Sequence, residues 1–162
     1  MQLIFEKFTR EDFESYYQLV GDLQVMAMIT ERSAPREQAR RDYEALLSKN
    51  ALHPDCGQFK IIDASNRQFV GLAKLEVEAA DSDKAEIGYM ILPQYWGRGV
   101  GGAVADWLVE RANAHLGLRR LFAIIDPANV PSKRILLRRE FESLEFRDFD
   151  GLPGEILELR LR

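Results

Sequence analysis

The stretch PQYWGRGVGGAV, residues 93–104, places four glycines within six positions. It follows AEIGYMIL, residues 85–92, which is typical of a strand, and leads into GAVADWLVERANAHLG, residues 102–117, whose apolar positions recur at helical spacing. The first N–H groups of a helix lack partners within the helix and lie at the positive end of its dipole. The stretch therefore predicts an anion site over residues 98–103, with a tight turn that binds nothing as the alternative. We favour the anion site because the glycines of GVGG exceed what a turn requires.

The whole chain has the composition of one ordinary globular domain. It has 162 residues, of which 46% are hydrophobic and 30% charged, and its formal net charge is -4. This charge gives no overall attraction to nucleic acid, and no run approaches the roughly 18 apolar residues of a membrane span. The opening MQLIFEKFTR is too short and too charged for a signal peptide. We expect a single cytoplasmic domain over residues 1–162 that binds neither nucleic acid nor membrane.

Cysteine and histidine usage gives no sign of a metal or a disulfide. Cys56 is the single cysteine, and the two histidines, His53 and His115, lie far apart in the sequence without metal-ligand spacing. We therefore expect neither an internal disulfide nor a bound metal.

Patterns along the chain predict strands alternating with helices. Strand patterns cover residues 3–8, 59–63, 69–77, 85–92, 119–126, 141–149 and 155–162. Helical patterns cover residues 10–20, 35–50, 102–117 and 129–139. In the third helix the apolar ladder consists of Val104, Leu108, Ala112 and Leu116. The fold class is α/β (α+β): a mixed, mostly antiparallel central sheet of about six to seven strands, flanked by about four helices.

A dinucleotide-binding fold is a rival interpretation of the glycines. Gly97, Gly99 and Gly102 satisfy G-x-G-x-x-G, and Asp126 lies near the expected acidic position. Against this, PQYW separates the preceding strand from the first glycine, and only 36 residues follow Asp126, too few for the remaining parallel strands. The P-loop pattern G-x-x-x-x-G-K-[ST] does not occur.

Two segments together resemble the GNAT superfamily of acyl-CoA N-acyltransferases: AEIGYMILPQYWGRGVGGAVADWLV and IIDPANVPSKRILLRREF. Within it they are similar to the ribosomal-protein alanine N-acetyltransferase branch. The loop aligns with the family pattern [QR]-x-x-G-x-[GA] over residues 96–101, where Trp96 replaces the usual Gln or Arg. The resemblance is close over residues 84–146, and the order of elements extends it to the whole chain.

The resemblance implies a GNAT fold and an acyltransferase of the EC 2.3.1 class. Such an enzyme transfers an acetyl group from acetyl-CoA, its co-substrate, to a primary amine of a protein N-terminus or a small molecule. The amine attacks directly in a ternary complex, and no metal is needed. The resemblance leaves open whether the protein is a monomer or a homodimer.

The resemblance also assigns residues to coenzyme A. The loop amides would hold the pyrophosphate, a role that falls to Arg98, Gly99, Val100, Gly101, Gly102 and Ala103, with Arg98 adding a cation. The pantetheine arm would pair with the exposed backbone of strand 85–92, at Met90 and Leu92, where that strand is splayed from the next one. Plain core packing is the alternative for both residues.

Catalytic residues follow from the chemistry of aminolysis and from the resemblance. Glu86 matches the position of a carboxylate that removes the amine proton in many members, and a solvated strand-edge glutamate is the alternative. A strand amide near Met90 is expected to stabilise the oxyanion.

The helix at 129–139 departs from the family pattern. Leu136 occupies the place of the tyrosine that many members use to protonate the thiolate, and Glu140 stands where glycine is usual. Ser132 on this helix, or an ordered water, would protonate the sulfur instead. Asn129 would hydrogen-bond the pantetheine or a water, or would only cap the helix.

The acceptor is expected to be set by residues 10–50 and the DGLPG turn at 150–154, whose mixed charges identify no substrate. The missing tyrosine also keeps open a second class of function, a non-catalytic acyl-CoA sensor or interaction module on the same fold.

Overall fold

The structure is a computed structural model that describes residues 1–115 and 117–162, so Leu116 of the expected ladder lies outside the described residues. Within these residues the strands are β1 Leu3–Lys7, β2 Gly57–Asp63, β3 Phe69–Glu76, β4 Lys84–Ile91, β5 Arg120–Ile125, β6 Glu142–Phe149 and β7 Leu152–Arg160. The α-helices are α1 Phe13–Val20, α2 Leu23–Met26, α3 Arg36–Asn50, α4 Val100–Ala114 and α5 Val130–Arg138. Two 3-10 turns are η1 Arg10–Asp12 and η2 Pro93–Tyr95.

The strands form one sheet in the order β1-β2-β3-β4-β5-β7-β6. Neighbouring strands are antiparallel except β4 and β5, which are parallel. The mixed, mostly antiparallel sheet of the sequence prediction is confirmed.

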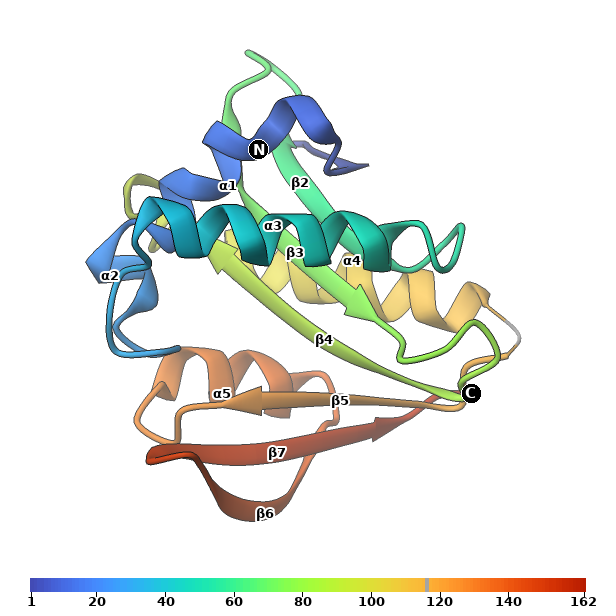
Figure 1. The fold of residues 1–162 in the computed structure, drawn as a ribbon. Coiled ribbons are helices and arrows are strands. Elements are labelled where there is room, and N and C mark those ends of the chain that lie inside the picture. Colours follow the sequence, from blue (N-terminus) through green and yellow to red (C-terminus); the bar gives the residue numbers. More distant parts are fainter. Residues whose placement is uncertain (116) are drawn as a thin grey trace.

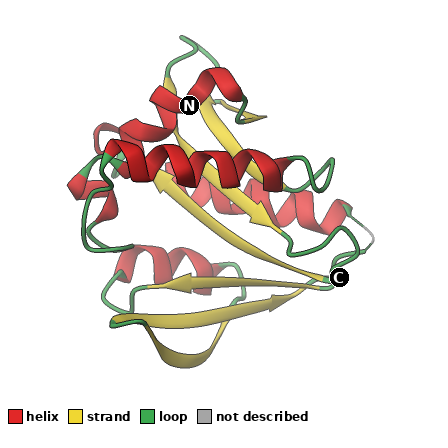
Figure 2. Cartoon of the chain, viewed as in Figure 1, coloured by secondary structure: helices red, strands yellow, loops and turns green. Residues whose placement is uncertain are grey.

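Helices cover both faces of this sheet, with α3 crossing one face and α4 lying behind the opposite one (Figure 1, Figure 2). Successive strand side chains point to opposite faces, so each face builds its own apolar cluster. On the α3 side Tyr16 and Tyr43 pack with Leu72 of β3. On the α4 side Val104 and Leu108 pack with residues of the central strands. No described helix is long and apolar enough to cross a membrane.

Helix α2 was not predicted from the sequence. The sequence patterns predict about four helices, and the described residues form five. Asp22 starts it, because its side chain accepts the N–H groups of Gln24 at 2.8 Å and Val25 at 3.2 Å. An aspartate directly before a short apolar run was the signal that would have found it.

The turn between β6 and β7 is shorter than expected, so the predicted five-residue connection is wrong. Asp150 and Gly151 have φ of 53° and 89°, which makes a tight two-residue hairpin turn. Phe149 pairs directly with Leu152, and Pro153 lies within β7.

Strands β4 and β5 part soon after they meet. Their register has only three residue pairs, from Lys84 with Arg120 to Glu86 with Phe122. Beyond these pairs the two strands diverge toward α2 and the loop that follows it (Figure 1). This divergence leaves one side of β4 without a strand partner and opens the sheet.

Candidate functional site

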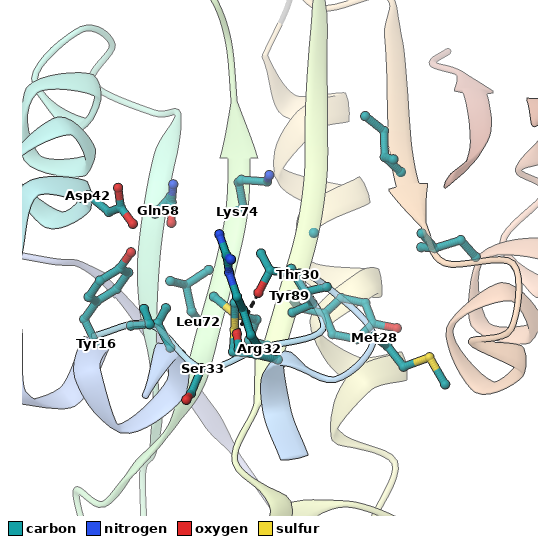
Figure 3. Close-up of a pocket in the computed structure, with 18 of the residues that line it drawn as sticks. Tyr16, Met28, Thr30, Arg32, Ser33, Asp42, Gln58, Leu72, Lys74 and Tyr89 are labelled. Carbon is teal, nitrogen blue, oxygen red and sulfur yellow. Dashed lines mark hydrogen bonds between the residues drawn. The ribbon is translucent and has the colours of Figure 1, made fainter. Parts of the chain in front are cut away.

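A cleft of about 930 Å³ lies where β4 and β5 diverge. One wall consists of residues 86–90 of β4, residues 123–125 of β5 and the facing turns of α5. The other wall comes from the segment between Met26 and Asp42, and the side chains of both walls surround a common hollow (Figure 3). The sheet opening and the cleft are therefore one feature.

Four of the sequence-predicted residues meet in this cleft: Glu86, Met90, Asn129 and Ser132 all line it. Residues 98–103 and Leu92 are absent from its described lining, as are residues 150–154 of the hairpin turn. The glycine loop instead joins the cleft through Tyr89, whose ring lies against Gly101.

The four glycines of the loop have two different structural reasons. Gly97 and Gly99 have φ of 74° and 78°, a left-handed backbone that favours glycine. A Cβ on Gly101 would lie 3.1 Å from the Ile135 Cδ1 atom. A Cβ on Gly102 would lie 3.0 Å from Nη2 of Arg139, the residue that caps the end of α5. Close packing of α5 on α4 thus explains two of the glycines, and the glycine count alone is not evidence for a ligand.

The start of α4 nevertheless offers donors to an anion. Its N-cap residue, Gly99, has no side chain to accept the first N–H groups. In the described part of the chain, the N–H groups of Val100, Gly101 and Gly102 donate to no backbone carbonyl. Arg98 is exposed beside them, with its guanidinium 5.8 Å from the Tyr95 ring. Free amides, the helix dipole and a cation together fit a diphosphate.

Two residues expected to bind the cofactor are hydrogen-bonded within the protein instead. The Ala103 N–H donates to the Gly99 carbonyl at 3.2 Å, as an ordinary helix bond. The Leu92 N–H donates to Val70 at 2.9 Å, and the Leu92 carbonyl accepts from Tyr95 at 3.0 Å. The Leu92 side chain is buried in the α3-side cluster. Leu92 is therefore a core residue, and Ala103 has no free amide for a phosphate.

The backbone of β4 presents Tyr89, not Met90, to the gap. A Cβ on Gly71 of β3 would lie 2.1 Å from the Met90 carbonyl oxygen, so this carbonyl faces β3. The backbone groups of successive strand residues point to alternate sides, so those of Tyr89 and Ile91 face the gap. The Ile91 carbonyl already accepts the Trp96 indole N–H at 2.8 Å. The expected pairing at the Met90 backbone is thus wrong, although the Met90 side chain lines the cleft.

Glu86 lies in a central strand and not at a sheet edge, so the strand-edge alternative is excluded. Its Oε2 atom is 3.0 Å from Lys74 Nζ, and the two side chains are 26% and 25% exposed. Lys74 also lines the cleft, where it shares the hollow with Arg32 from the opposite wall (Figure 3). The cleft thus contains a half-buried carboxylate beside an ammonium group.

Asn129 caps α5, which is the structural role that the sequence analysis gave as the alternative to ligand binding. Its Oδ1 atom accepts the Ser132 N–H at 3.3 Å, which leaves its amide nitrogen available. The Ser132 hydroxyl lies 3.3 Å from the Tyr89 hydroxyl. Leu136 lines the same wall and is 2% exposed, so the position of the missing tyrosine does lie at the cleft.

The two histidines are neighbours in space, although they are far apart in the sequence. The His53 and His115 ring centroids are 4.7 Å apart. Burial, and next the charge of His115, lower the pKa of His53. Among the described residues, no group of three or more His, Cys, Asp or Glu side chains is placed to hold a metal ion.

Comparison with known proteins decides the family, because the acetyltransferase (GNAT) domain model matches residues 2–142. The chain belongs to the GNAT acetyltransferase family. A relative of this GNAT domain is the uncharacterized N-acetyltransferase p20 of Bacillus licheniformis, 23% identical over 98% of this chain and 89% of p20.

Solved structures share the fold of this GNAT domain. Spermidine N-acetyltransferase from Vibrio cholerae, in complex with CoA and spermine, has a TM-score of 0.81 at 16% identity, covering 98% of this chain and 95% of that one. RimL, a ribosomal L7/L12 alpha-N-protein acetyltransferase in complex with coenzyme A, has a TM-score of 0.79 at 13% identity, covering 99% and 95%.

Sequence reasoning missed two parts of this GNAT site. Tyr89 was given no role in the site, because a strand pattern does not show which hydroxyl group reaches a neighbouring helix. The segment between Met26 and Pro35 was expected only as part of the acceptor region, and α2, which directly precedes it, was not recognised. The aspartate cap at position 22 was the available signal.

Proposed function

We propose that residues 1–162 act as one domain that transfers the acetyl group of acetyl-CoA to a primary amine, by direct attack in a ternary complex. The observation that carries this proposal is the parting of β4 and β5 into a cleft that contains Glu86, next to an uncapped start of α4. The name of p20 and the CoA and spermine in the Vibrio cholerae structure support the same reaction class.

The residues present fit acetyl-CoA, which supplies the acetyl thioester when bound. The free amides of Val100, Gly101 and Gly102, with Arg98, would hold its diphosphate. The gap-facing backbone of Tyr89 would pair with the pantetheine and offer its N–H to the thioester oxygen. The Asn129 amide nitrogen would hydrogen-bond the same arm.

Glu86 is the proposed base for the acceptor amine. An amine must lose a proton as it attacks, and a carboxylate within hydrogen-bond reach accepts it directly or through one water. Lys74 positions the carboxylate by its ion pair with Oε2. Ser132 of α5 also lines the cleft, and the leaving sulfur would lie beside it.

The acceptor side of the cleft is balanced in charge. Three cations, Arg32, Arg41 and Lys74, and three carboxylates, Glu37, Asp42 and Glu86, line it among the described residues. A polycation is attracted to a site with excess negative charge. The balanced lining favours an acceptor with a single amine, such as a peptide N-terminus or an amino acid, over a polyamine.

A thermal-shift assay followed by a thiol-release assay tests the proposal. CoA is expected to raise the melting temperature by mass action, and NAD is not. Arg98→Glu is expected to weaken CoA binding by about tenfold, because it places like charge at the diphosphate. Stabilisation by NAD alone would support a dinucleotide-binding fold instead.

Thiol release from acetyl-CoA is then measured with peptides, amino acids and spermine as acceptors. A peptide or amino acid is expected to give the higher kcat/KM. Tight CoA binding without thiol release for any amine would establish the acyl-CoA sensor, which Leu136 at the tyrosine position motivates.

A further inference from the structure

Tyr89 connects the gap to both helices behind it. Its hydroxyl lies 3.3 Å from Ser132 Oγ on α5. Its ring lies against the first turn of α4, because a Cβ on Gly101 would be 3.4 Å from Tyr89 Cε2 and 3.6 Å from its hydroxyl. Both Tyr89 and Ser132 line the cleft. The phenol therefore ends at the place where β4, α4 and α5 converge.

Breaking a thioester leaves a charged sulfur that needs a hydrogen-bond donor. Among the described residues, the hydroxyls that line the cleft belong to Tyr16, Thr30, Ser33, Tyr89 and Ser132. Tyr16 belongs to α1, and Thr30 and Ser33 belong to the opposite wall. The Thr30 hydroxyl already donates to the Arg32 carbonyl at 2.7 Å. Only Tyr89 and Ser132 come from the elements that flank the gap.

We infer that Tyr89 is the residue that donates a proton to the departing sulfur, with Ser132 as the positioning residue that holds the phenol. This inference rests on the proposed acetyl transfer. The bond from the amine nitrogen to the acetyl carbon forms, and the carbon–sulfur bond breaks with its electron pair on sulfur. The sulfur takes the phenolic proton, the amine proton goes to Glu86, and solvent returns a proton to the phenolate.

The surroundings keep this phenol protonated until it is needed. Burial raises the pKa of Tyr89, while the Ser132 hydrogen bond and the Arg139 charge partly oppose that shift. A neutral phenol that donates to an anion makes a charge-assisted hydrogen bond, which is stronger than a neutral one. A donor held in place for an anionic sulfur also favours the thiolate of bound CoA over its thiol.

The test is an ultraviolet titration of the thiol of bound CoA, recorded as a difference spectrum against the CoA-free protein. Tyr89→Phe is expected to raise the midpoint of thiolate formation by about one pH unit, because the phenol no longer stabilises the anion. Ser132→Ala is expected to shift it in the same direction by less. Tyr17→Phe is the matched control, because Tyr17 stacks on Phe13 of α1 outside the cleft, and it is expected to leave the midpoint unchanged.

Steady-state kinetics provide the second measurement. Tyr89→Phe is expected to lower kcat by roughly 100-fold, with the KM for acetyl-CoA within about twofold of the wild-type value. An unchanged thiol midpoint or an unchanged kcat in a variant that still binds CoA overturns the role of Tyr89 alone. A wild-type protein that binds no CoA overturns the proposed function and this inference together.

Discussion

Glu140 ends α5 with φ of 70°, in the left-handed region that usually requires glycine. The Glu140 N–H donates to Leu137 at 3.1 Å, and the Phe141 N–H donates to Leu136 at 3.1 Å. The chain therefore makes a left-handed helix-ending turn of the kind that favours glycine, although glutamate is unfavourable there. Replacing the usual glycine by Glu140 therefore strains the backbone at this residue and does not change the turn.

Glu140→Gly is expected to stabilise the protein by about 0.5–1 kcal/mol, because relief of the left-handed strain exceeds the entropy cost of glycine. Urea denaturation measures the change. Glu140→Ala is the control, since alanine keeps the strain and should give no such gain. A glycine variant no more stable than the alanine variant would contradict the strain.

Glu86→Gln is expected to lower kcat by about 10²- to 10⁴-fold, because glutamine cannot accept the amine proton. Thiol release at saturating acetyl-CoA and amine measures it. Lys74→Met is the control: it removes the ion-pair partner but leaves the base, so its loss should be smaller. Equal losses in both variants would show that Glu86 matters only as a partner of Lys74.

The position of a residue could be predicted where a sequence motif determines it. It was missed where the position depends on contacts with other parts of the fold. Glu86 and Ser132 both line the cleft, because a strand and a helix start fix their positions, and their catalytic roles stay predictions. For Leu92 the core alternative holds. Its N–H continues the β3–β4 pairing to Val70 and its carbonyl accepts from Tyr95 in the η2 turn, and the strand pattern alone does not show these bonds.

At the scale of elements, the N-cap of α5 belongs both to the fold and to the site. The Asn129 Oδ1 atom accepts the Ser132 N–H, and so fixes the start of the helix that carries the serine. The amide nitrogen on the same side chain is the part available to a ligand. Two substitutions can separate the two roles.

Asn129→Ala is expected to lower the free energy of unfolding by about 1 kcal/mol, and Asn129→Asp to change it little, because aspartate caps as well as asparagine. CoA affinity is expected to fall in both variants, since both lose the amide donor. Calorimetric titration together with urea denaturation measures both effects. Undiminished CoA affinity in Asn129→Asp would leave Asn129 as a cap alone.

Element boundaries were predicted less well than element types. The spacing of apolar residues and the local composition predicted every strand and the four longer helices, because each of these elements has an apolar face to bury. The start of α4 was expected at Gly102, whereas the helix begins at Val100. Left-handed Gly99 decides that boundary, and a glycine-rich sequence does not show which glycine adopts positive φ.

At the scale of the whole molecule, one buried carboxylate ties the last hairpin to α5. Glu155 is fully buried, and its Oε2 atom accepts from Ser143 at 2.6 Å and pairs with Lys133 at 2.9 Å. Burial opposes its ionisation, but these hydrogen bonds and the Lys133 charge lower the pKa of Glu155 below its ordinary value of 4.5. A lowered folded-state pKa stabilises the protein above the unfolded value, and this stability is lost as pH falls through the folded one.

Glu155→Gln is expected to cost about 1–3 kcal/mol at pH 7, because it removes a charged hydrogen-bond acceptor. The difference from wild type should shrink as pH falls below about 4.5. Urea denaturation at pH 7 and at a pH below about 4.5 measures the free energy of unfolding of both proteins. Glu158→Gln on the same strand should cost under about 1 kcal/mol, since its partner Arg120 is exposed and 3.9 Å away. A Glu155 effect that is constant with pH would contradict the ion pair.

The overall arrangement could be predicted because the alternation of elements leaves few topologies. The cleft could not, since its lining comes from separate stretches of the chain: residues 16–42, three positions of β2 and β3 (Gln58, Leu72 and Lys74), and residues 86–136. Their meeting depends on how α2 and α3 pack over the sheet, and a single chain carries no local signal for that packing.

The parting of β4 from β5 divides the sheet into four strands on one side and three on the other. A pantetheine arm lying along Tyr89 would restore backbone pairing across this seam. The four-stranded and three-stranded units would then open together instead of separately. Amide hydrogen exchange in β5 and β7 would slow when CoA binds, while exchange in β1 and β2, far from the seam, would keep its rate.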